Sequence, residues 1–409
     1  MANTFLTVPQ IAKAMLAVVR NEGVLLDSVN RQFDSEFKGG TGDYCNVLKP
    51  VRYILGDGAD ITNDIQTITQ KYTTLQITEH KHLAISPTRK EMTLDIKDFA
   101  KQFLANIGLE FAEHMDYKIG SLFDEVYYNA GTPGTTPSAF SDMTAVARVA
   151  DRYAIPQRGR VLVVNEDAKW GLADALKGTF DASLAKDSIR TGDIGIVGNM
   201  RVKMDQNVNK FTSGTCTGTP VVDTVDGVTY ITGTGGSVET STLHTDGWTG
   251  TLKEGDIITI GSVYGLNPAN RQSTGTLQPF VVRALCTGAT DSPLTISPAI
   301  IISGPYQNVD AAPVAEATIT VITQAVQDTA TSLSAQNLCF HPDAFTLACV
   351  PLADVPDGQG VDTFTMNYEG LAITVTKGFD ILTGRFIIRF DLMYGVKAIN
   401  PALAVRMLA

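Results

Sequence analysis

The chain has 409 residues, of which 44% are hydrophobic and 18% are charged, and its formal net charge is −11. A chain of this length can bury an ample core in two or three domains, and its composition is typical of a folded protein. The negative charge disfavours a broad nucleic-acid-binding surface, because phosphate contacts need clustered lysine and arginine side chains. Solubility through self-repulsion is the simplest explanation of that charge.

The cysteines and the N-terminus indicate a protein made in the cytoplasm. The five cysteines are scattered and form no CxxC pair, which favours reduced thiols over a disulfide framework. Lys13 interrupts the first apolar segment, and no small-residue cleavage site follows it, so a secretory signal is not expected. No apolar run approaches the roughly 18 residues that a membrane span requires.

Residues 1–42 are expected to form an N-terminal arm. Two short amphipathic helices are predicted, one that begins near Pro9 and one from Val24 to Phe33, followed by the flexible sequence KGGTG at 38–42. Such an arm could pack on its own chain as a helical hairpin or lie on a neighbouring subunit.

Residues 43–92 are expected to form a long β-hairpin. The segment from Tyr44 to Leu55 is strand-like, and residues 75–78 and 83–86 alternate between apolar and polar side chains, as half-buried strands do. An isolated hairpin is marginally stable in water, so this one should pack against its own body or against another chain.

One helical pattern of about ten turns runs from Thr93 to Asn129. Thr93 is a plausible N-cap, and Gly131 and Pro133 are expected to end the helix. Its apolar residues recur mainly at steps of four, each of which advances about 40° around the axis, so the apolar stripe winds around the helix. Such a rod is typical of a plate that contacts many neighbours.

The remaining chain is predicted to be a mixed α/β body with a β-rich insertion. A helix is expected at 143–153, a buried strand at 160–165, a helix from Glu166 and a strand at 195–204. Between about 213 and 322, turn signals recur every eight to twelve residues, as in an all-β sandwich or barrel. A strand at 338–340 followed by a helix that begins near His341 resumes the α/β pattern, and the C-terminal part is rich in strands.

Candidate chemical sites are few. The chain contains no GxSxG, HExxH, Walker or dinucleotide-binding motif. Glu79, His80 and His82 could hold a metal ion, but a solvated strand face is the favoured interpretation because no further histidine or cysteine lies near in sequence. The acidic residues of 57–64 could bind a hard cation, although a charged loop tip that pairs with basic residues of a neighbour is favoured. No catalytic residue, cofactor or metal ion is therefore expected.

Four stretches carry a family resemblance. They are EFAEHMDYKIGSLFDEVYYN at 110–129, LKEGDIITIGSVYGLNPANRQSTGTLQPFVV at 252–282, FHPDAFTLA at 340–348 and LMYGVKAINPALAVRML at 392–408. With the order of the predicted segments, they make the chain resemble a tailed-bacteriophage major capsid protein of the Hong Kong 97 fold. The resemblance is to the short-tailed phage branch whose coat proteins carry a β-barrel insertion domain.

The resemblance implies an α+β capsid fold with an N-arm, an E-loop, a spine helix, a peripheral (P) domain and an axial (A) domain, together with an inserted all-β barrel. The expected parts are the N-terminal arm at 1–42, the E-loop hairpin at 43–92, the spine helix and P domain at 93–140, the first part of the A domain at 141–212, the inserted barrel at 213–324, the second part of the A domain at 325–382 and a C-terminal P-domain strand at 383–409.

The resemblance also implies a function and partners. The chain would assemble with itself into pentamers and hexamers of an icosahedral shell around a double-stranded DNA genome. A scaffolding protein would guide assembly in the host cytoplasm, a portal would occupy one vertex, and the packaged DNA would be bound only weakly and non-specifically. The alternative is another phage structural protein, a tail tube or an adhesin, with a receptor-binding insertion. Inter-subunit contacts are expected from residues of the hairpin: Arg52, Asp57, Asp60, Asp64 and Lys71.

Overall fold

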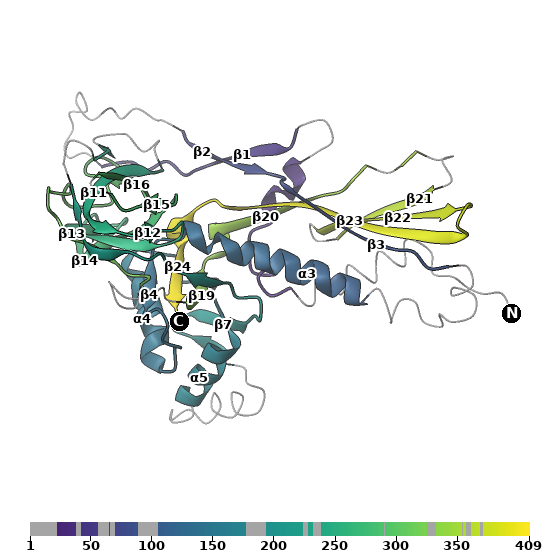
Figure 1. Cartoon of the computed structure of the whole chain (residues 1–409), viewed down its shortest axis with the longest axis horizontal. Helices are drawn as coiled ribbons and strands as arrows, with labels where there is room; N and C mark the ends of the chain where they lie inside the picture. The colour runs from purple at the N-terminus through teal and green to yellow at the C-terminus, as the bar shows by residue number, and fades with distance from the viewer. Residues whose placement is uncertain are drawn as a thin grey trace. The chain divides into compact units, whose positions relative to one another are not determined.

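A computed structural model describes residues 23–37, 42–55, 65, 70–88, 105–176, 194–223, 228–231, 239–289, 291–324, 333–353, 355–356, 361–368 and 371–409. The chain is mixed α+β, and its contacts divide it into two compact units. The first unit takes in residues up to Val47, Thr74–Ile119 and Phe345–Lys397. The second takes in Leu48–Thr73, Gly120–Ala344 and Ala398–Ala409. The chain therefore passes repeatedly from one unit to the other (Figure 1).

A seven-stranded mixed sheet forms the body of the second unit. Its main path runs β4 (Asn129–Gly131), β24 (Ala404–Leu408), β19 (Leu333–Phe340), β5 (Arg160–Val164), β7 (Met200–Met204) and β6 (Ile196–Val197), and β8 (Lys210–Thr212) pairs with β19. Strand β19 runs antiparallel to both of its main neighbours, whereas β5 and β7 are parallel. Helices α4 (Phe140–Arg152) and α5 (Glu166–Leu176) flank these strands (Figure 1).

The local sequence explains these body elements. The carboxylate of Asp142 accepts the backbone N–H of Ala139 at 3.0 Å and so caps the start of α4. The side chain of Asn165 accepts the N–H of Ala168 at 3.2 Å, which caps α5 directly after β5. All five residues of β5 are buried. The predicted strand at 160–165 and both predicted helices are confirmed.

The β-rich insertion forms a barrel inside the second unit. Its six-stranded sheet has the order β18 (Ile319–Val321), β13 (Ile257–Leu266), β14 (Ser273–Val282), β16 (Ser292–Ser297), β11 (Ser241–Thr249) and β9 (Thr217–Val222). The end strands meet, because Val221 bridges to Thr318 and the N–H of Val222 donates to the carbonyl of Ala317 at 3.0 Å. Two short pairs accompany the barrel, β10 (Tyr230–Ile231) with β17 (Ile300–Ile301) and β12 (Thr251–Leu252) with β15 (Cys286–Thr287).

The barrel encloses an apolar core of its own. Fully buried side chains from several strands meet there, among them Leu243, Ile258, Phe280 and Ile296. This core is separate from the cluster that joins the mixed sheet to α4 and α5. The predicted all-β barrel is confirmed.

The first unit is built on a five-stranded sheet. Its order is β20 (Phe345–Val350), β23 (Arg385–Ala398), β22 (Leu371–Asp380) and β21 (Val361–Tyr368), and β3 (Glu79–Ile85) also pairs with β23. Figure 1 shows β21, β22 and β23 as long neighbouring strands. Strands β1 (Tyr44–Leu48) and β2 (Tyr72–Gln76) pair with each other as a two-stranded hairpin. Strand β1 covers only the first part of the strand predicted from Tyr44 to Leu55, and residues 49–55 lie outside any strand. The strands predicted at 75–78 and 83–86 overlap β2 and β3, and β3 joins the larger sheet.

The long helix is shorter than predicted at its C-terminal end. Helix α3 covers Ala105–Gly120, a 3₁₀ turn covers Ser121–Glu125, and Asn129–Gly131 is strand β4, so the prediction of one helix to Asn129 is wrong. The reason is tertiary, because β4 pairs in parallel with Arg406–Leu408 of β24. The predicted start at Thr93 lies outside the described residues. Ile107, Phe111, Met115 and Ile119 are all buried, which agrees with the predicted steps of four.

Two other predicted helices are corrected. After β19 the chain makes only a 3₁₀ turn at Pro342–Ala344 and then enters β20, whose first five residues are buried. The predicted helix from Val24 to Phe33 is replaced by turns and a 3₁₀ segment at Gln32–Glu36. The Asp116 carboxylate of α3 accepts the N–H groups of Val24 and Leu26 at 2.7 and 2.9 Å and so holds a non-helical turn. The first predicted helix of the arm lies outside the described residues.

The boundaries of the two compact units can be compared with the boundaries of the predicted parts of the fold. Residues up to Ala344 group with the mixed sheet, whereas Phe345–Lys397 group with α3 and β3. The division falls inside the segment 325–382 that we expected to complete the A domain. Within the predicted C-terminal strand, β23 and β24 are separate strands in different sheets, joined through a 3₁₀ turn at Pro401–Leu403.

Candidate inter-subunit surface

The base of the predicted E-loop hairpin, by which we mean residues 49–52 and Lys71, lies against the barrel of its own chain. Lys49 forms an ion pair with Glu239. The N–H of Arg52 donates to the hydroxyl of Tyr306 at 3.3 Å, and the ammonium of Lys71 lies 4.9 Å from the centroid of the same ring. These contacts hold the segment that follows β1 and the residue that precedes β2 against the barrel.

The structure places two of the five expected contact residues. Arg52 and Lys71 both lie at this base, where Tyr306 brings them together. Burial lowers the pKa of Lys71, the nearby charge of Lys49 lowers it further, and the charge of Glu239 acts in the opposite direction. Asp57, Asp60 and Asp64 lie outside the described residues.

Apolar side chains of the hairpin are exposed to solvent in the single chain. Leu55 is 97% exposed and Ile65 is 78% exposed. The aromatic rings of Tyr44, Tyr53 and Tyr72 are more than half exposed as well. Isolated exposed apolar residues are common, but several large ones in one segment of the chain are consistent with a surface that binds another protein.

A groove of about 540 Å³ separates the end of this hairpin segment from a loop of the barrel. Its lining includes Arg52, Tyr53, Ile54, Leu55, Pro268 and Arg271. The guanidinium of Arg271 donates to the carbonyl of Tyr53 at 2.9 Å and so ties the two walls together. The groove is therefore lined by both apolar and polar residues, among them two arginines.

A buried carboxylate fixes both ends of the barrel insertion. Asp256 is fully buried and accepts hydrogen bonds from the N–H of Gly214 at 3.0 Å and from the hydroxyl of Thr323 at 2.7 Å. It also accepts the N–H of Lys253 at 2.7 Å. Burial raises the pKa of Asp256, and these hydrogen bonds act in the opposite direction. Because Gly214 and Thr323 lie where the chain enters and leaves the insertion, one side chain holds the two crossings together.

Arg406 of β24 connects the two ends of the insertion, which we call the insertion junction, to the mixed sheet. It is fully buried and donates to the carbonyl of Gly255 at 2.7 Å and to the side-chain oxygen of Gln336 at 2.6 Å. Its guanidinium lies 5.0 Å from the ring centroid of Phe123 and 5.7 Å from that of Phe211. The barrel and the mixed sheet are thus joined through a satisfied buried charge.

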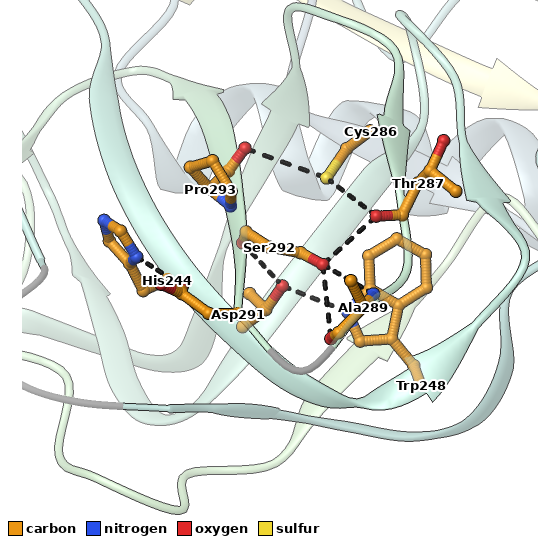
Figure 2. Close-up of polar contacts among 9 residues, drawn as sticks. His244, Trp248, Cys286, Thr287, Ala289, Asp291, Ser292 and Pro293 are labelled. Atoms are coloured by element: carbon orange, nitrogen blue, oxygen red, sulfur yellow. Dashed lines mark hydrogen bonds and ion pairs between the residues drawn. The ribbon is translucent and has the colours of Figure 1, made fainter.

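A cluster of His, Asp and Ser side chains in the barrel does not form a catalytic arrangement. His244 pairs with Asp291 at 2.6 Å, but the hydroxyl of Ser292 accepts the N–H of Ala289 at 2.8 Å and lies 3.1 Å from the carbonyl of Thr287. Figure 2 shows this hydroxyl turned toward Thr287 and Ala289 and away from the ring of His244. The hydroxyl therefore closes a turn and is not presented to a base.

Two of the three candidate metal ligands on β3, Glu79 and His80, take part in ion pairs. Glu79 pairs with Lys118 at 2.8 Å and with Lys81 at 3.0 Å, and these partners lower its pKa. His80 pairs with the buried carboxylate of Asp391 at 3.0 Å. No group of three or more potential metal ligands occurs among the residues that the structure describes. Within the same residues, no helix is long and apolar enough to cross a membrane.

The insertion junction, formed by Asp256, Gln336 and Arg406, was not predicted from the sequence. Asp256, Gln336 and Arg406 come from segments that lie far apart in the chain, so no spacing rule connects them. One local signal exists, because Arg406 is the single charged residue in the apolar run ALAVRMLA, and such a residue requires a buried partner if the run is a core strand.

Comparisons with known proteins give a family match over almost the whole chain. Residues 1–408 match the family described as P22 coat protein, gene protein 5. The chain is 24% identical over 415 aligned positions to a protein called "Major capsid protein" from Acyrthosiphon pisum secondary endosymbiont phage 1, with 96% of this chain and 95% of that protein covered.

Solved structures are also similar. A structure from Mycobacterium phage Che8 matches with a TM-score of 0.47 and 13% identity, over 94% of this chain and 90% of that one. The capsid of Ralstonia phage GP4 matches with a TM-score of 0.46 and 10% identity, over 93% and 87%.

The family match over residues 1–408 defines a structural protein of a phage capsid shell. The chain belongs to the P22 coat protein family. It is a phage major capsid protein, it assembles with copies of itself, and its place is the virion capsid. The family and the fold expected from the sequence are confirmed. The family is one of structural proteins and not of enzymes.

Proposed function

We propose that this chain forms pentamers and hexamers of an icosahedral shell around double-stranded DNA. In this proposal a scaffolding protein guides assembly in the host cytoplasm, a portal occupies one vertex, and the DNA is bound only weakly and non-specifically. The subunit has no catalytic activity and needs no cofactor. The family assignment and the net charge of −11 support the proposal.

The observation that carries the proposal is the exposed apolar surface of the hairpin. Leu55 is 97% exposed and Ile65 is 78% exposed in one chain, and the hairpin's contacts with its own barrel leave them uncovered. Burying an aliphatic side chain of this size contributes roughly 1.5–3 kcal/mol, so a neighbour that covers the hairpin gains substantial stability. We therefore assign residues 43–92 the role of the E-loop, which reaches over an adjacent subunit.

The other parts of the fold receive matching roles. Helix α3 serves as the spine of the P domain, and the mixed sheet with α4 and α5 serves as the A domain. The barrel at 213–324 stabilises the subunit and contributes contacts between capsomers. In the same proposal, Arg52 and Lys71 hold the hairpin base, and Asp57, Asp60 and Asp64 pair with basic residues of the neighbour.

The test combines two hairpin variants with particle assembly. Deletion of residues 56–64, or the double substitution Leu55→Ser with Ile65→Ser, is expected to leave the monomer folded and to reduce the yield of closed particles. Particles are counted by negative-stain microscopy and sedimentation, with the scaffolding protein added if the wild-type chain requires it. The monomer is checked by thermal unfolding.

A matched control is Leu75→Ser, because Leu75 belongs to the same hairpin but is fully buried. It should lower the stability of the monomer itself. If Leu55→Ser with Ile65→Ser lowers monomer stability as Leu75→Ser does, the hairpin packs within its own chain and the proposed reach is wrong. Wild-type chains that form only irregular aggregates under all conditions would contradict the shell itself.

A further inference from the structure

Helix α5 has an exposed face with a tryptophan at its centre. Trp170 is 62% exposed, although α5 buries Ala168 and Leu172 in the core of the mixed sheet. Glu166, Asp167 and Asp174 are exposed as well. They lie three or four residues from Trp170, so their side chains share its face of the helix. The ammonium of Lys169 lies 5.4 Å from the centroid of the Trp170 ring. This face, the α5 acidic face, therefore joins a large aromatic surface to three carboxylates and one cation.

The groove beside the hairpin base has the opposite character. Arg52 and Arg271 supply positive charge, and Ile54, Leu55 and Pro268 supply apolar surface. The hydrogen bond from Arg271 to Tyr53 uses only part of a guanidinium that has five N–H donors. The described lining of the groove contains no residue of α5 from the same chain. Its volume of about 540 Å³ accommodates a ring the size of indole.

The barrel wall of the groove is preorganised. It is formed by the loop between β13 and β14, in which the N–H of Asn267 donates to the carbonyl of Gln272 at 3.0 Å and the N–H of Arg271 donates to the carbonyl of Asn267 at 2.8 Å. The side chain of Asn270 also accepts the N–H of Gln272 at 3.0 Å. A wall fixed in this way loses little conformational entropy on binding, which favours a specific contact.

We infer that the α5 acidic face of one subunit docks in the groove of a second copy of this chain, with Trp170 between Arg52 and Arg271. The inference deepens the proposed function, since it rests on self-assembly and names both surfaces of one contact. Tryptophan and arginine are the residue types that most often dominate interface energies, and a guanidinium over an indole ring adds a cation–π attraction. The carboxylates beside Trp170 then face the two guanidinium groups.

The contact links two different surfaces of the subunit, so it is heterologous. Such a contact passes from each copy to the next and closes into a ring when the rotation between copies allows it. The two surfaces come from the body and from the hairpin base with the barrel, and both belong to the same compact unit. Each subunit can therefore offer both surfaces at once, as a capsomer requires.

The first test is a charge exchange. Arg271→Glu and Asp174→Lys are each expected to raise the subunit concentration needed for particle formation by about tenfold, and the double variant is expected to return it toward the wild-type value. Asp174→Lys places a cation in the C-terminal half of α5, where the helix dipole tolerates it. Single variants that assemble like the wild type, or a double variant that is as impaired as the worse single one, would overturn the inference.

The second test is a chemical cross-link. It does not require a double variant to restore assembly. The background is Cys45→Ser, because Cys45 is the only cysteine of the chain that is not buried. Ala269→Cys at the groove rim and Asp174→Cys on α5 are introduced together, and assembled particles are treated with a short bismaleimide. Covalent dimers and longer ladders are expected in denaturing gels. The control pairs Ala269→Cys with Ser141→Cys at the exposed start of α4 and should give none.

The outcomes separate the inference from the proposed function. Particles that form but give no ladder with the Ala269 and Asp174 pair overturn the docking contact and leave the shell function standing. Cross-linking of Ala269→Cys to the scaffolding protein alone overturns it too, because the groove then has another occupant. Failure of the unmodified chain to form particles contradicts the proposed function instead.

Discussion

Asp256 shows how one side chain can hold an inserted domain in place. Its carboxylate accepts hydrogen bonds from Gly214 at one end of the insertion and from Thr323 at the other. Arg406 reaches the adjacent carbonyl of Gly255 from the body. A buried charge of this kind is tolerated because every strong donor and acceptor around it finds a partner. The residues therefore act as a unit, and removing one leaves the others unpaired.

We predict that Asp256→Ala lowers the free energy of unfolding by about 3 kcal/mol, because buried N–H groups and the guanidinium of Arg406 lose their compensation. Urea unfolding followed by circular dichroism measures the change. The matched control is Glu254→Ala, two residues away and exposed, which should change stability by less than about 0.5 kcal/mol. Equal effects of the two substitutions would show that the junction contributes nothing beyond a surface charge.

A second residue gives a prediction for pH. Asp34 accepts the N–H of Cys349 at 3.0 Å, and burial raises its pKa from 3.8 to about 6, against the lowering effects of that hydrogen bond and of Arg31. The folded chain thus binds this proton more tightly than the unfolded chain does. The contribution of Asp34 to stability is therefore most favourable at low pH and declines as the pH rises from about 4 to about 6.

Asp34→Asn removes the ionisation and keeps an acceptor oxygen for Cys349. We expect the variant to exceed the wild type in stability by about 1 kcal/mol at about pH 7.5, a value reduced because the carboxyl group remains partly in solvent, and to match it near pH 4. Urea titrations at both pH values measure the difference. Glu36→Gln, in the same 3₁₀ turn, is the control and should leave the pH dependence of the wild type intact. A stability gap that is constant with pH would exclude titration of Asp34 as its cause.

At the scale of elements, the barrel is a closed structure with its own core. Its first and last strands meet through Val221 and Thr318, and Asp256 ties its two ends from inside the insertion. We predict that residues 213–325 expressed alone fold and give a cooperative, β-rich unfolding transition. The fragment should be less stable than the barrel in the whole chain, because it lacks Arg406.

Thermal unfolding followed by circular dichroism tests the fragment. The substitution Phe280→Ala, at a fully buried core position, should abolish its transition or lower the midpoint strongly, since truncations of this type cost about 3–5 kcal/mol. A wild-type fragment without a cooperative transition would mean that the barrel needs the body in order to fold.

Elements whose signal is local could be predicted from the sequence. The run RVLVV becomes β5 with every residue buried, and α5 begins at Glu166 as expected. The apolar steps of four in α3 also identify the buried face correctly. These patterns express backbone periodicity and capping, which depend on neighbours in the chain.

Elements that depend on distant partners could not be predicted. The segment after Gly120 has a helical pattern, yet pairing of Asn129–Gly131 with β24 makes it a strand. The chain after His341 enters β20, which lies in a sheet with β23. For the candidate surface, the sequence indicated charged hairpin residues, but only the fold shows that Arg52 and Lys71 share Tyr306. A linear pattern holds no information on which residues meet across such separations.

At the scale of the whole molecule, assembly must overcome like charge. Each subunit carries a formal charge of −11, and a shell brings many copies together. Exposed apolar surface and local charge pairs favour association, whereas the net charge opposes it over distances beyond a single contact. The Debye length is about 30 Å at 0.01 M salt and about 10 Å at 0.1 M, so added salt weakens the long-range repulsion more than it weakens close contacts.

We predict that the subunit concentration at which particles first form falls when sodium chloride is raised from about 20 to about 200 mM, because screening reduces the repulsion between subunits of charge −11. Light scattering of a dilution series at each salt concentration measures this threshold, and microscopy confirms that the scattering comes from closed particles. A neutral osmolyte at matched osmolarity is the control and should not reproduce the fall. The opposite result, a threshold that rises with salt, would mean that ion pairs such as those inferred between α5 and the groove outweigh the net repulsion between whole subunits.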